Sequence, residues 1–292
     1  MAILVNQDTH VIIQGITGTQ GSYHAARMLE YNVKLVGGVV PGRGGRQVEG
    51  VPVFDTVAEA CAAARVDASL VLVPPPFVLE AAAEAIECGI PLVVVITEHV
   101  PVLDSMRLVA LARQRGVRVV GPNTIGVISP GKSKVGIMPG YIYSPGPVGI
   151  VSRSGTLTHE VASNLTFRGI GQSTCVGIGG DPIVGTTFVE VLELFRHDPE
   201  TEAVVLIGEI GGGAEEEAAE YLRAGYPKPV LAFIAGQTAP PEKRMGHAGA
   251  IVQGSSGTAA AKMQRLKEAG VRVASTLDGI LDEVKAVLSH VA

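Results

Sequence analysis

Residues 10–39 read HVIIQGITGTQGSYHAARMLEYNVKLVGGV. Two short apolar runs, at residues 10–14 and 33–39, enclose a glycine-bearing turn and a segment with apolar residues at helical spacing. Continuous apolar runs are typical of strands that are buried on both faces of a parallel sheet, and a helix then has to cross between them. The stretch therefore predicts a β-α-β unit, the repeating element of a doubly wound α/β fold.

The same alternation of apolar runs and Ala/Glu-rich helical segments extends along the chain. Three more runs precede a turn-rich bridge at residues 121–147 and five follow it, at 69–74, 91–97, 117–121, 148–152, 173–179, 203–212, 229–236 and 271–275. The Gly and Pro residues of the bridge indicate a domain change or a connecting hairpin. We expect two doubly wound parallel-sheet α/β domains in series, over residues 1–121 and 122–292, with ligands beyond the carboxyl ends of the strands.

The composition excludes several classes of protein. With 47% hydrophobic residues and a formal net charge of -5 without a basic run, the chain does not fit a nucleic-acid-binding protein. Its apolar runs are far shorter than the ~20 residues that span a bilayer, and the first ten residues lack the features of a signal peptide. Three widely spaced cysteines, Cys61, Cys88 and Cys175, argue against a disulfide framework or a zinc site. We therefore expect a cytoplasmic protein that binds neither nucleic acid nor membrane.

The turn GITGTQG, residues 15–21, places three glycines where a strand leads into a helix. Such a turn lets backbone N–H groups approach a phosphate at the helix N-terminus, although glycines there also serve close packing of strand and helix. An NAD site needs a carboxylate at the end of the second strand, whereas this chain has Arg43 in a glycine turn. The pattern indicates a ligand with an additional phosphate, such as NADP or coenzyme A (CoA). The segments 73–77 and 96–101 suggest a slot for adenine or pantetheine.

Strand ends in the second half of the chain present polar groups beside glycines. Ser154 and Gly155, in the string SRSG, open a helix, which either offers unpaired N–H groups to an anion or is a plain Ser154 N-cap. Glu209 ends another strand, within GEIGGG. A carboxylate there can accept from one ring nitrogen of a histidine and so fix its tautomer, or it can be an exposed acid. Asp181, within GIGGDP, allows the same two interpretations.

His247 lies among four glycines in KRMGHAGAIVQGSSGTAAAK, residues 243–262. A neutral imidazole is a good nucleophile near pH 7, because its reference pKa is about 6.5. Flanking glycines would let a phosphorylated histidine move between two partners, whereas the plain alternative is a solvated surface loop. The SRSG string and Glu209 favour the interpretation of His247 as a phosphoryl carrier over that of a solvated loop. His159, one turn into the helix that Ser154 opens, is a candidate substrate contact.

The motifs GITGTQG, PGRGG, ITE, SRSGTLT, GEIGG and GHAGAIV with GSSGTAAAK follow one another in this order. Together they make the chain resemble the alpha subunits of succinyl-CoA synthetase (succinate–CoA ligase) over essentially its whole length. The resemblance implies a Rossmann-like CoA-binding domain over residues 1–121. A flavodoxin-like ligase domain that carries a phosphohistidine loop would follow over residues 122–292.

The resemblance also implies roles for individual residues. Contacts with CoA would come from two strand ends and from an arginine in place of the family's usual lysine: Thr17, Gly18, Thr19, Gln20, Arg43, Ile96, Thr97 and Glu98. In the second domain, His247 matches the phosphorylated residue and Glu209 the carboxylate that orients it. Ser154 and Gly155 match the helix terminus that cradles the phosphate. His159 stands where the family usually has a tyrosine that contacts the carboxylate substrate, and no metal ligand is expected in this chain.

The implied reaction converts succinyl-CoA, phosphate and a nucleoside diphosphate into succinate, CoA and a nucleoside triphosphate, through succinyl phosphate and a phosphohistidine. A beta subunit similar to ATP-grasp proteins would supply Mg²⁺ and the ATP/ADP or GTP/GDP site, in an αβ or α2β2 assembly that serves the citric acid cycle. A malate–CoA ligase subunit, which His159 allows, stays open as a rival. A sensor of CoA or NADP is a second rival, but it would not need the His247 loop, Glu209 and the SRSG turn together. We expect no further domain after Ala292, which disfavours a fused lyase.

Overall fold

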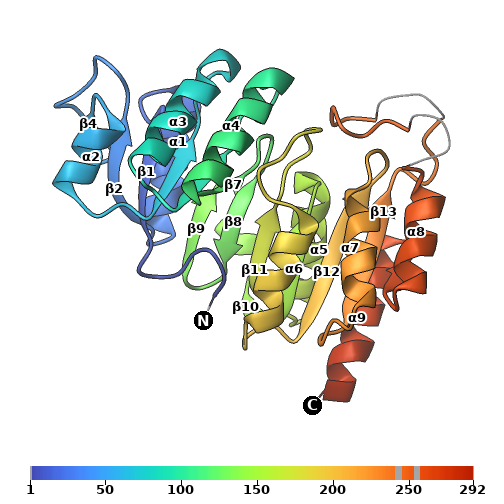
Figure 1. The fold of residues 1–292 in the computed structure, drawn as a ribbon. Coiled ribbons are helices and arrows are strands. Elements are labelled where there is room, and N and C mark those ends of the chain that lie inside the picture. Colours follow the sequence, from blue (N-terminus) through green and yellow to red (C-terminus); the bar gives the residue numbers. More distant parts are fainter. Residues whose placement is uncertain (1, 241–244, 253–256, 292) are drawn as a thin grey trace.

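The computed structural model describes residues 2–240, 245–252 and 257–291. In this part of the chain, two seven-stranded sheets lie side by side (Figure 1). The last strand of the first sheet ends at Val120, and the first strand of the second sheet begins at Gly126. The two sheets together confirm the predicted α/β class.

The first sheet has the strand order β3-β4-β2-β1-β5-β6-β7. Its strands are β1 (His10–Gln14), β2 (Lys34–Val39), β3 (Gln47–Val48), β4 (Val51–Phe54), β5 (Ala68–Val71), β6 (Leu92–Val95) and β7 (Arg118–Val120). All neighbours pair in parallel except β3, which pairs antiparallel with β4 at the edge. Without β3, the order is the one typical of dinucleotide-binding domains.

The second sheet has the strand order β14-β13-β12-β10-β11-β8-β9. Its strands are β8 (Gly126–Ser129), β9 (Ser133–Gly136), β10 (Pro145–Ser152), β11 (Gln172–Gly177), β12 (Ala203–Glu209), β13 (Val230–Ala235) and β14 (Arg272–Ala274). The five strands from β10 to β14 are parallel and follow the flavodoxin-like order. The turn-rich bridge contains the hairpin β8–β9, which pairs antiparallel with β11 and so extends the second sheet.

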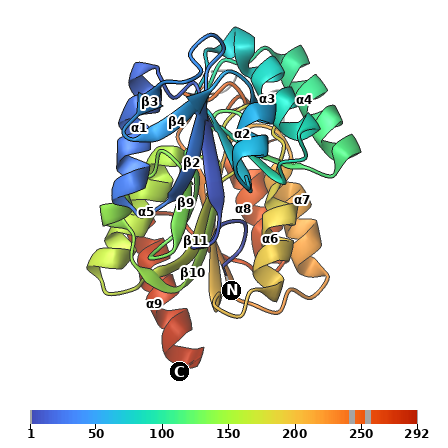
Figure 2. The ribbon, with the colours of Figure 1, turned by 90° about the vertical axis from the view of Figure 1, so that its left-hand side faces the viewer.

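Helices cover both faces of each sheet (Figure 2). They are α1 (Thr19–Glu30), α2 (Val57–Ala63), α3 (Val78–Glu87), α4 (Val102–Arg115), α5 (Gly155–Phe167), α6 (Phe188–His197), α7 (Ala214–Arg223), α8 (Ala259–Glu268) and α9 (Leu277–Val291), with short 3-10 turns η1 (Pro75–Phe77) and η2 (Gly140–Ile142). Figure 2 shows α1, α5 and α9 on one side and α2, α3, α4, α6, α7 and α8 on the other. This arrangement is the doubly wound fold that the sequence predicts.

The core explains why the long apolar runs are readable from sequence and the short elements are not. Val11, Ile12 and Ile13 of β1 have no exposed surface, since helices pack on both faces of the strand. In contrast, β4, which lies between the edge strand β3 and β2, alternates buried residues with more exposed ones and contains Pro52, so it lacks a continuous apolar run. The sequence analysis accordingly did not predict β3, β4 or α2.

Candidate active site

A cleft of about 600 Å³ runs between the two sheets, with walls from both halves of the chain. Eight of the predicted site residues line it together: Gln20, Ile96, Thr97, Glu98, Ser154, Gly155, His159 and His247. They come from α1, from the loop after β6, from the first turns of α5 and from the loop after β13. Loops that follow the carboxyl ends of the parallel strands therefore bring together residues that are far apart in sequence.

A second cavity, of about 740 Å³, lies over the turn between β1 and α1. Thr17, Gly18, Thr19 and Gln20 line it, and Gln20 also lines the cleft, so the two spaces adjoin. The predicted slot after β5 contributes further wall residues, Val73, Pro74 and Phe77. Arg43 is exposed in the turn that follows the wall residue Pro41 and does not itself line the cavity.

The β1–α1 turn depends on its glycines for close backbone contacts. Gly15 has a φ of +90°, and a Cβ there would lie 2.8 Å from the Leu72 carbonyl oxygen. A Cβ on Gly21 would lie 2.1 Å from the Gly15 carbonyl oxygen. No side chain caps the N-terminus of α1, whose first turn contains no acidic residue. Its N–H groups and the helix dipole therefore favour an anion at this end.

His247 and Glu209 form a direct contact in the second half of the molecule. The His247 Nδ1 lies 2.7 Å from the Glu209 Oε2. Glu209 is the last residue of β12 and only 6% exposed, while the His247 side chain is half-buried. The hydrogen bond to Glu209 raises the pKa of His247 above its usual value, although burial alone would lower it. With Nδ1–H donating to the carboxylate, Nε2 keeps the free lone pair.

Arg153 turns inward behind this pair. Its Nε lies 3.3 Å from the Glu209 Oε1, and its guanidinium donates to the Asp181 backbone carbonyl at 3.2 Å. The Asp181 carboxylate instead accepts from the Asn123 side-chain amide at 3.0 Å. Of the two candidate carboxylates, Glu209 is therefore the one that holds His247. Arg153 belongs to the SRSG string that the sequence analysis treats as an anion site. Its guanidinium instead forms an ion pair with the buried Oε1 of Glu209.

Lys262 is a structural partner that the sequence analysis missed. Its fully buried ammonium donates to the carbonyls of Glu209 at 2.9 Å and of Gly211 at 2.6 Å, and it pairs with the buried Glu215 carboxylate. Glu215 in turn accepts from the Glu209 backbone N–H at 3.0 Å. The available signal is the spacing of Lys262 with Ala259 and Leu266, which puts the lysine on the buried face of α8.

Glycines also shape the space around His247. A Cβ on Gly180 would lie 2.3 Å from the His247 Cγ, so the imidazole packs directly on this backbone. Gly249 donates its N–H to the Gly180 carbonyl at 3.3 Å. Gly246 has a φ of +74°, in the left-handed region that favours glycine, and a Cβ there would meet no atom within 4 Å. Gly254, another predicted hinge, lies outside the described residues.

The N-terminus of α5 faces the cleft. The Ser154 hydroxyl caps the helix by accepting from the Leu157 N–H at 3.3 Å. A Cβ on Gly155 would lie 2.5 Å from the Ile125 Cγ2, so glycine permits this close approach. The first turn contains no acidic residue, and Thr156 joins Ser154 and Gly155 in lining the cleft. Ser154 is thus a plain cap, and the same helix end offers N–H groups to an anion.

His159 lies one turn further along α5. Its Nε2 is buried without a hydrogen-bond partner among the described residues, and its ring stands edge-on to Tyr143 at 6.2 Å. Burial lowers the pKa of His159, so the neutral form prevails near pH 7. A neutral imidazole that lines the cleft with an unsatisfied nitrogen can donate to, or accept from, a bound substrate.

Comparisons with known proteins agree with this geometry. The CoA binding domain family matches residues 6–99, and the CoA-ligase family matches residues 151–272. A succinate–CoA ligase [ADP-forming] subunit alpha 1 from Archaeoglobus fulgidus is 56% identical over 288 residues, which cover 99% of each chain. The corresponding alpha subunit from Aquifex aeolicus is 56% identical over 290 residues, 99% of this chain and 95% of the relative. The chain belongs to the family of succinate–CoA ligase alpha subunits.

Membership in this succinate–CoA ligase family confirms the predicted resemblance and the expected acid–thiol ligase class. A solved ATP citrate lyase from Methanosaeta concilii, with bound (3S)-citryl-CoA, superposes with a TM-score of 0.92 at 25% identity. The match covers 99% of this chain and 51% of the lyase chain, so this chain spans about half the length of that protein. The malate–CoA ligase and sensor alternatives are not favoured by these relatives.

Two features are absent from the described part of the chain. None of the helices there is long and apolar enough to cross a membrane. Within the same parts of the chain, no three His, Cys, Asp or Glu side chains gather in a way that could hold a metal ion.

Proposed function

We propose that the chain works as the alpha subunit of a cytoplasmic succinate–CoA ligase of the citric acid cycle. With a beta subunit, it would interconvert succinyl-CoA, phosphate and a nucleoside diphosphate with succinate, CoA and a nucleoside triphosphate. The observation that carries the proposal is the 2.7 Å contact between His247 and Glu209 in a cleft that also contains predicted CoA residues. The boundaries 1–121 and 122–292 remain our assignment of the CoA-binding and ligase domains.

In this proposal, CoA occupies the 740 Å³ cavity and extends toward the cleft through the shared wall at Gln20. The N–H groups of Thr19 and Gln20 at the start of α1 bind its phosphates. Arg43, exposed in the turn beyond the wall residue Pro41, adds a guanidinium for a phosphate. Ile96, Thr97 and Glu98, which line the cleft, bind the pantetheine end.

Phosphate binds at the N-terminus of α5, where Ser154 and Gly155 offer a helix dipole and unpaired N–H groups. A phosphate oxygen attacks the thioester carbonyl of succinyl-CoA. The carbon–oxygen bond forms, the carbon–sulfur bond breaks, and CoA leaves as the thiolate that takes up a proton. His159 is suited to hold the carboxylate substrate, because its neutral ring has a free buried nitrogen in the same cleft.

His247 then receives the phosphoryl group. Glu209 holds the proton on Nδ1, so the Nε2 lone pair attacks the phosphorus of succinyl phosphate and succinate leaves. The adjacent carboxylate stabilises the positive charge that develops on the ring. Positioning and charge compensation of this kind supply most of the catalysis in phosphoryl transfer.

The second transfer takes place on a partner chain. The alpha-subunit names of the relatives imply a beta subunit, and we assign to it an ATP-grasp fold. That subunit would bind ATP/ADP or GTP/GDP with Mg²⁺, which neutralises the transferring phosphates. The glycine-flanked His247 loop carries the phosphoryl group to it, in a single heterodimer or in a dimer of heterodimers.

A substrate panel tests the proposal. The full chain is co-purified with its beta subunit, and thioester formation from CoA and nucleoside triphosphate is followed with succinate, malate or citrate. We expect the highest kcat/KM with succinate. A higher kcat/KM with malate would contradict the assignment of succinate and support a malate–CoA ligase. Retention of CoA binding without thioester formation from any of the acids would contradict a ligase and support the sensor.

A further inference from the structure

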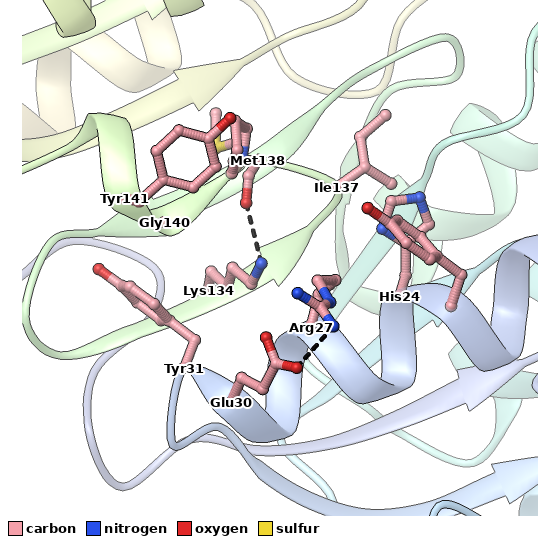
Figure 3. Close-up of a pocket in the computed structure, with 11 residues that line it drawn as sticks. His24, Arg27, Glu30, Tyr31, Lys134, Ile137, Met138, Gly140 and Tyr141 are labelled. Carbon is pink, nitrogen blue, oxygen red and sulfur yellow. Dashed lines mark hydrogen bonds and ion pairs between the residues drawn. The ribbon is translucent and has the colours of Figure 1, made fainter.

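A third cavity, of about 450 Å³, lies between α1 of the first sheet and the segment β9–η2 of the second (Figure 3). None of the residues that the sequence assigns to catalysis or to CoA lines it. His24 and Ile137 line both this cavity and the cleft, so the two spaces adjoin at these side chains. We call this third cavity the α1–hairpin pocket.

Lys134 provides a buried positive charge to the α1–hairpin pocket. The residue is 2% exposed, and its ammonium donates to the Met138 carbonyl at 2.9 Å above the ring of Tyr31. No carboxylate of the described residues lies within ion-pair distance of it, in contrast to Lys262 with its partner Glu215. A buried charge without a counterion is costly. Accordingly, burial first and Arg27 second lower the pKa of Lys134 to about 8, and the Glu30 carboxylate opposes this shift only in part.

Arg27 brings a second cation to the same pocket. Figure 3 shows Lys134 reaching in from the hairpin and Arg27 from α1. Arg27 pairs with Glu30 at 2.6 Å, and this carboxylate balances one of the two positive charges. Burial and the nearby Lys134 lower the pKa of His24, so this residue is mostly neutral near pH 7. The pocket therefore retains an excess of positive charge.

We propose that the α1–hairpin pocket is a second binding site, distinct from the catalytic cleft, for a small anion with carboxylate or phosphate oxygens held by Lys134 and Arg27. Each cation can donate charge-assisted hydrogen bonds to such oxygens. The occupant supplies the counter-charge that Lys134 lacks. Tyr31 and the exposed Tyr141, which also line the pocket, provide aromatic surface for the body of an organic anion. This site does not depend on the proposed reaction.

The methyl group of Met138 is a local reporter of binding. The full chain contains six methionines, so a sample labelled with ¹³C in the methionine methyl groups gives a simple NMR spectrum, and Met138→Leu assigns the signal. Sodium succinate and inorganic phosphate are titrated separately, with sodium chloride at matched ionic strength as reference. We expect a saturable shift of the Met138 signal with at least one of the two probes, and the probe that binds identifies the source of the anion.

Three variants test whether the α1–hairpin pocket binds the anion that shifts the Met138 signal. Lys134→Gln and Arg27→Gln should each weaken binding by about tenfold or more, because each removes a charged donor. Lys132→Gln, in the turn of the same hairpin, should bind as the wild type does. If Lys134→Gln does not fold, as judged by its other methionine signals, Arg27→Gln on the exposed helix face decides alone.

Three results would overturn the site. They are the absence of a saturable shift with both probes, equal affinity in Arg27→Gln and the wild type, and an equal shift with chloride, which would mean an adventitious ion only. None of these results bears on the His247 chemistry, because neither Lys134 nor Arg27 lines the cleft.

Discussion

The His247 Nδ1 lies 2.7 Å from the Glu209 Oε2, although 38 residues separate them in the chain. Both residues lie at the carboxyl ends of neighbouring parallel strands, Glu209 at the end of β12 and His247 in the loop after β13. Arg153 and Lys262 hold Glu209 from behind, through its side chain and its backbone carbonyl. This arrangement fixes one tautomer of a histidine whose other nitrogen is available to a substrate.

Replacing Glu209 by Gln tests the orientation of the histidine. Because the carboxylate raises the pKa of His247, its removal should lower that pKa. The acid limb of the rate of His247 phosphorylation should then move to lower pH, while the maximal rate falls by about 10- to 100-fold. Stopped assays across the pH range measure both effects. Glu217→Gln, exposed on α7, is the control, and an acid limb that stays in place would contradict the assignment.

Replacing Lys262 by Met tests the buried support of Glu209. The change leaves the Glu215 carboxylate buried without its partner, so the free energy of unfolding should fall by about 3 kcal/mol or more. Adding Glu215→Gln should restore part of the loss, because it removes the uncompensated charge. Urea denaturation of the two single variants and the double variant measures these changes in the free energy of unfolding. Lys267→Met, on the exposed face of α8, is the control. Equal stability of Lys262→Met and Lys267→Met would disprove this role.

Replacing Gly180 by Ala tests the packing of the imidazole. The new methyl group would lie 2.3 Å from the His247 Cγ, so the ring must move away from Glu209. We expect phosphorylation of His247 to slow by about tenfold or more, with the affinity for CoA unchanged, since misplacement of a reacting group is costly. Gly213→Ala has no neighbour within 4 Å and serves as the matched control. Similar rates in both variants would show that His247 does not depend on this contact.

Replacing Arg43 by Glu tests the position of CoA. The change reverses a charge beside the 740 Å³ cavity and should weaken CoA binding by about tenfold or more, as measured by calorimetry. Arg46→Glu, exposed in the same loop, controls for a general change in surface charge. If both variants bind CoA equally well, the phosphates of CoA lie elsewhere.

The doubly wound fold is readable from sequence, because strands buried on both faces form continuous apolar runs. The grouping of eight candidate site residues in one cleft is readable as well, because each lies in the loop or helix that follows a strand. Glu209 and His247 were found because parallel strands bring their carboxyl ends together. The inward orientation of Arg153 and the buried pair of Lys262 and Glu215 were not predicted from the sequence. Both depend on how α7 and α8 pack against β12. The α1–hairpin pocket was not predicted either, because it depends on how α1 packs against the β9–η2 segment of the other half of the chain.

The central claim is that His247 carries the phosphoryl group. The chain, with its beta subunit, is incubated with nucleoside triphosphate labelled in the γ-phosphate, and the labelled protein is treated with acid or base. We predict an acid-labile, base-stable label on the chain that succinate with CoA discharges. The label should be absent in His247→Asn and present in His197→Asn, at the exposed end of α6. Equal labelling of His247→Asn and the wild type would contradict the account.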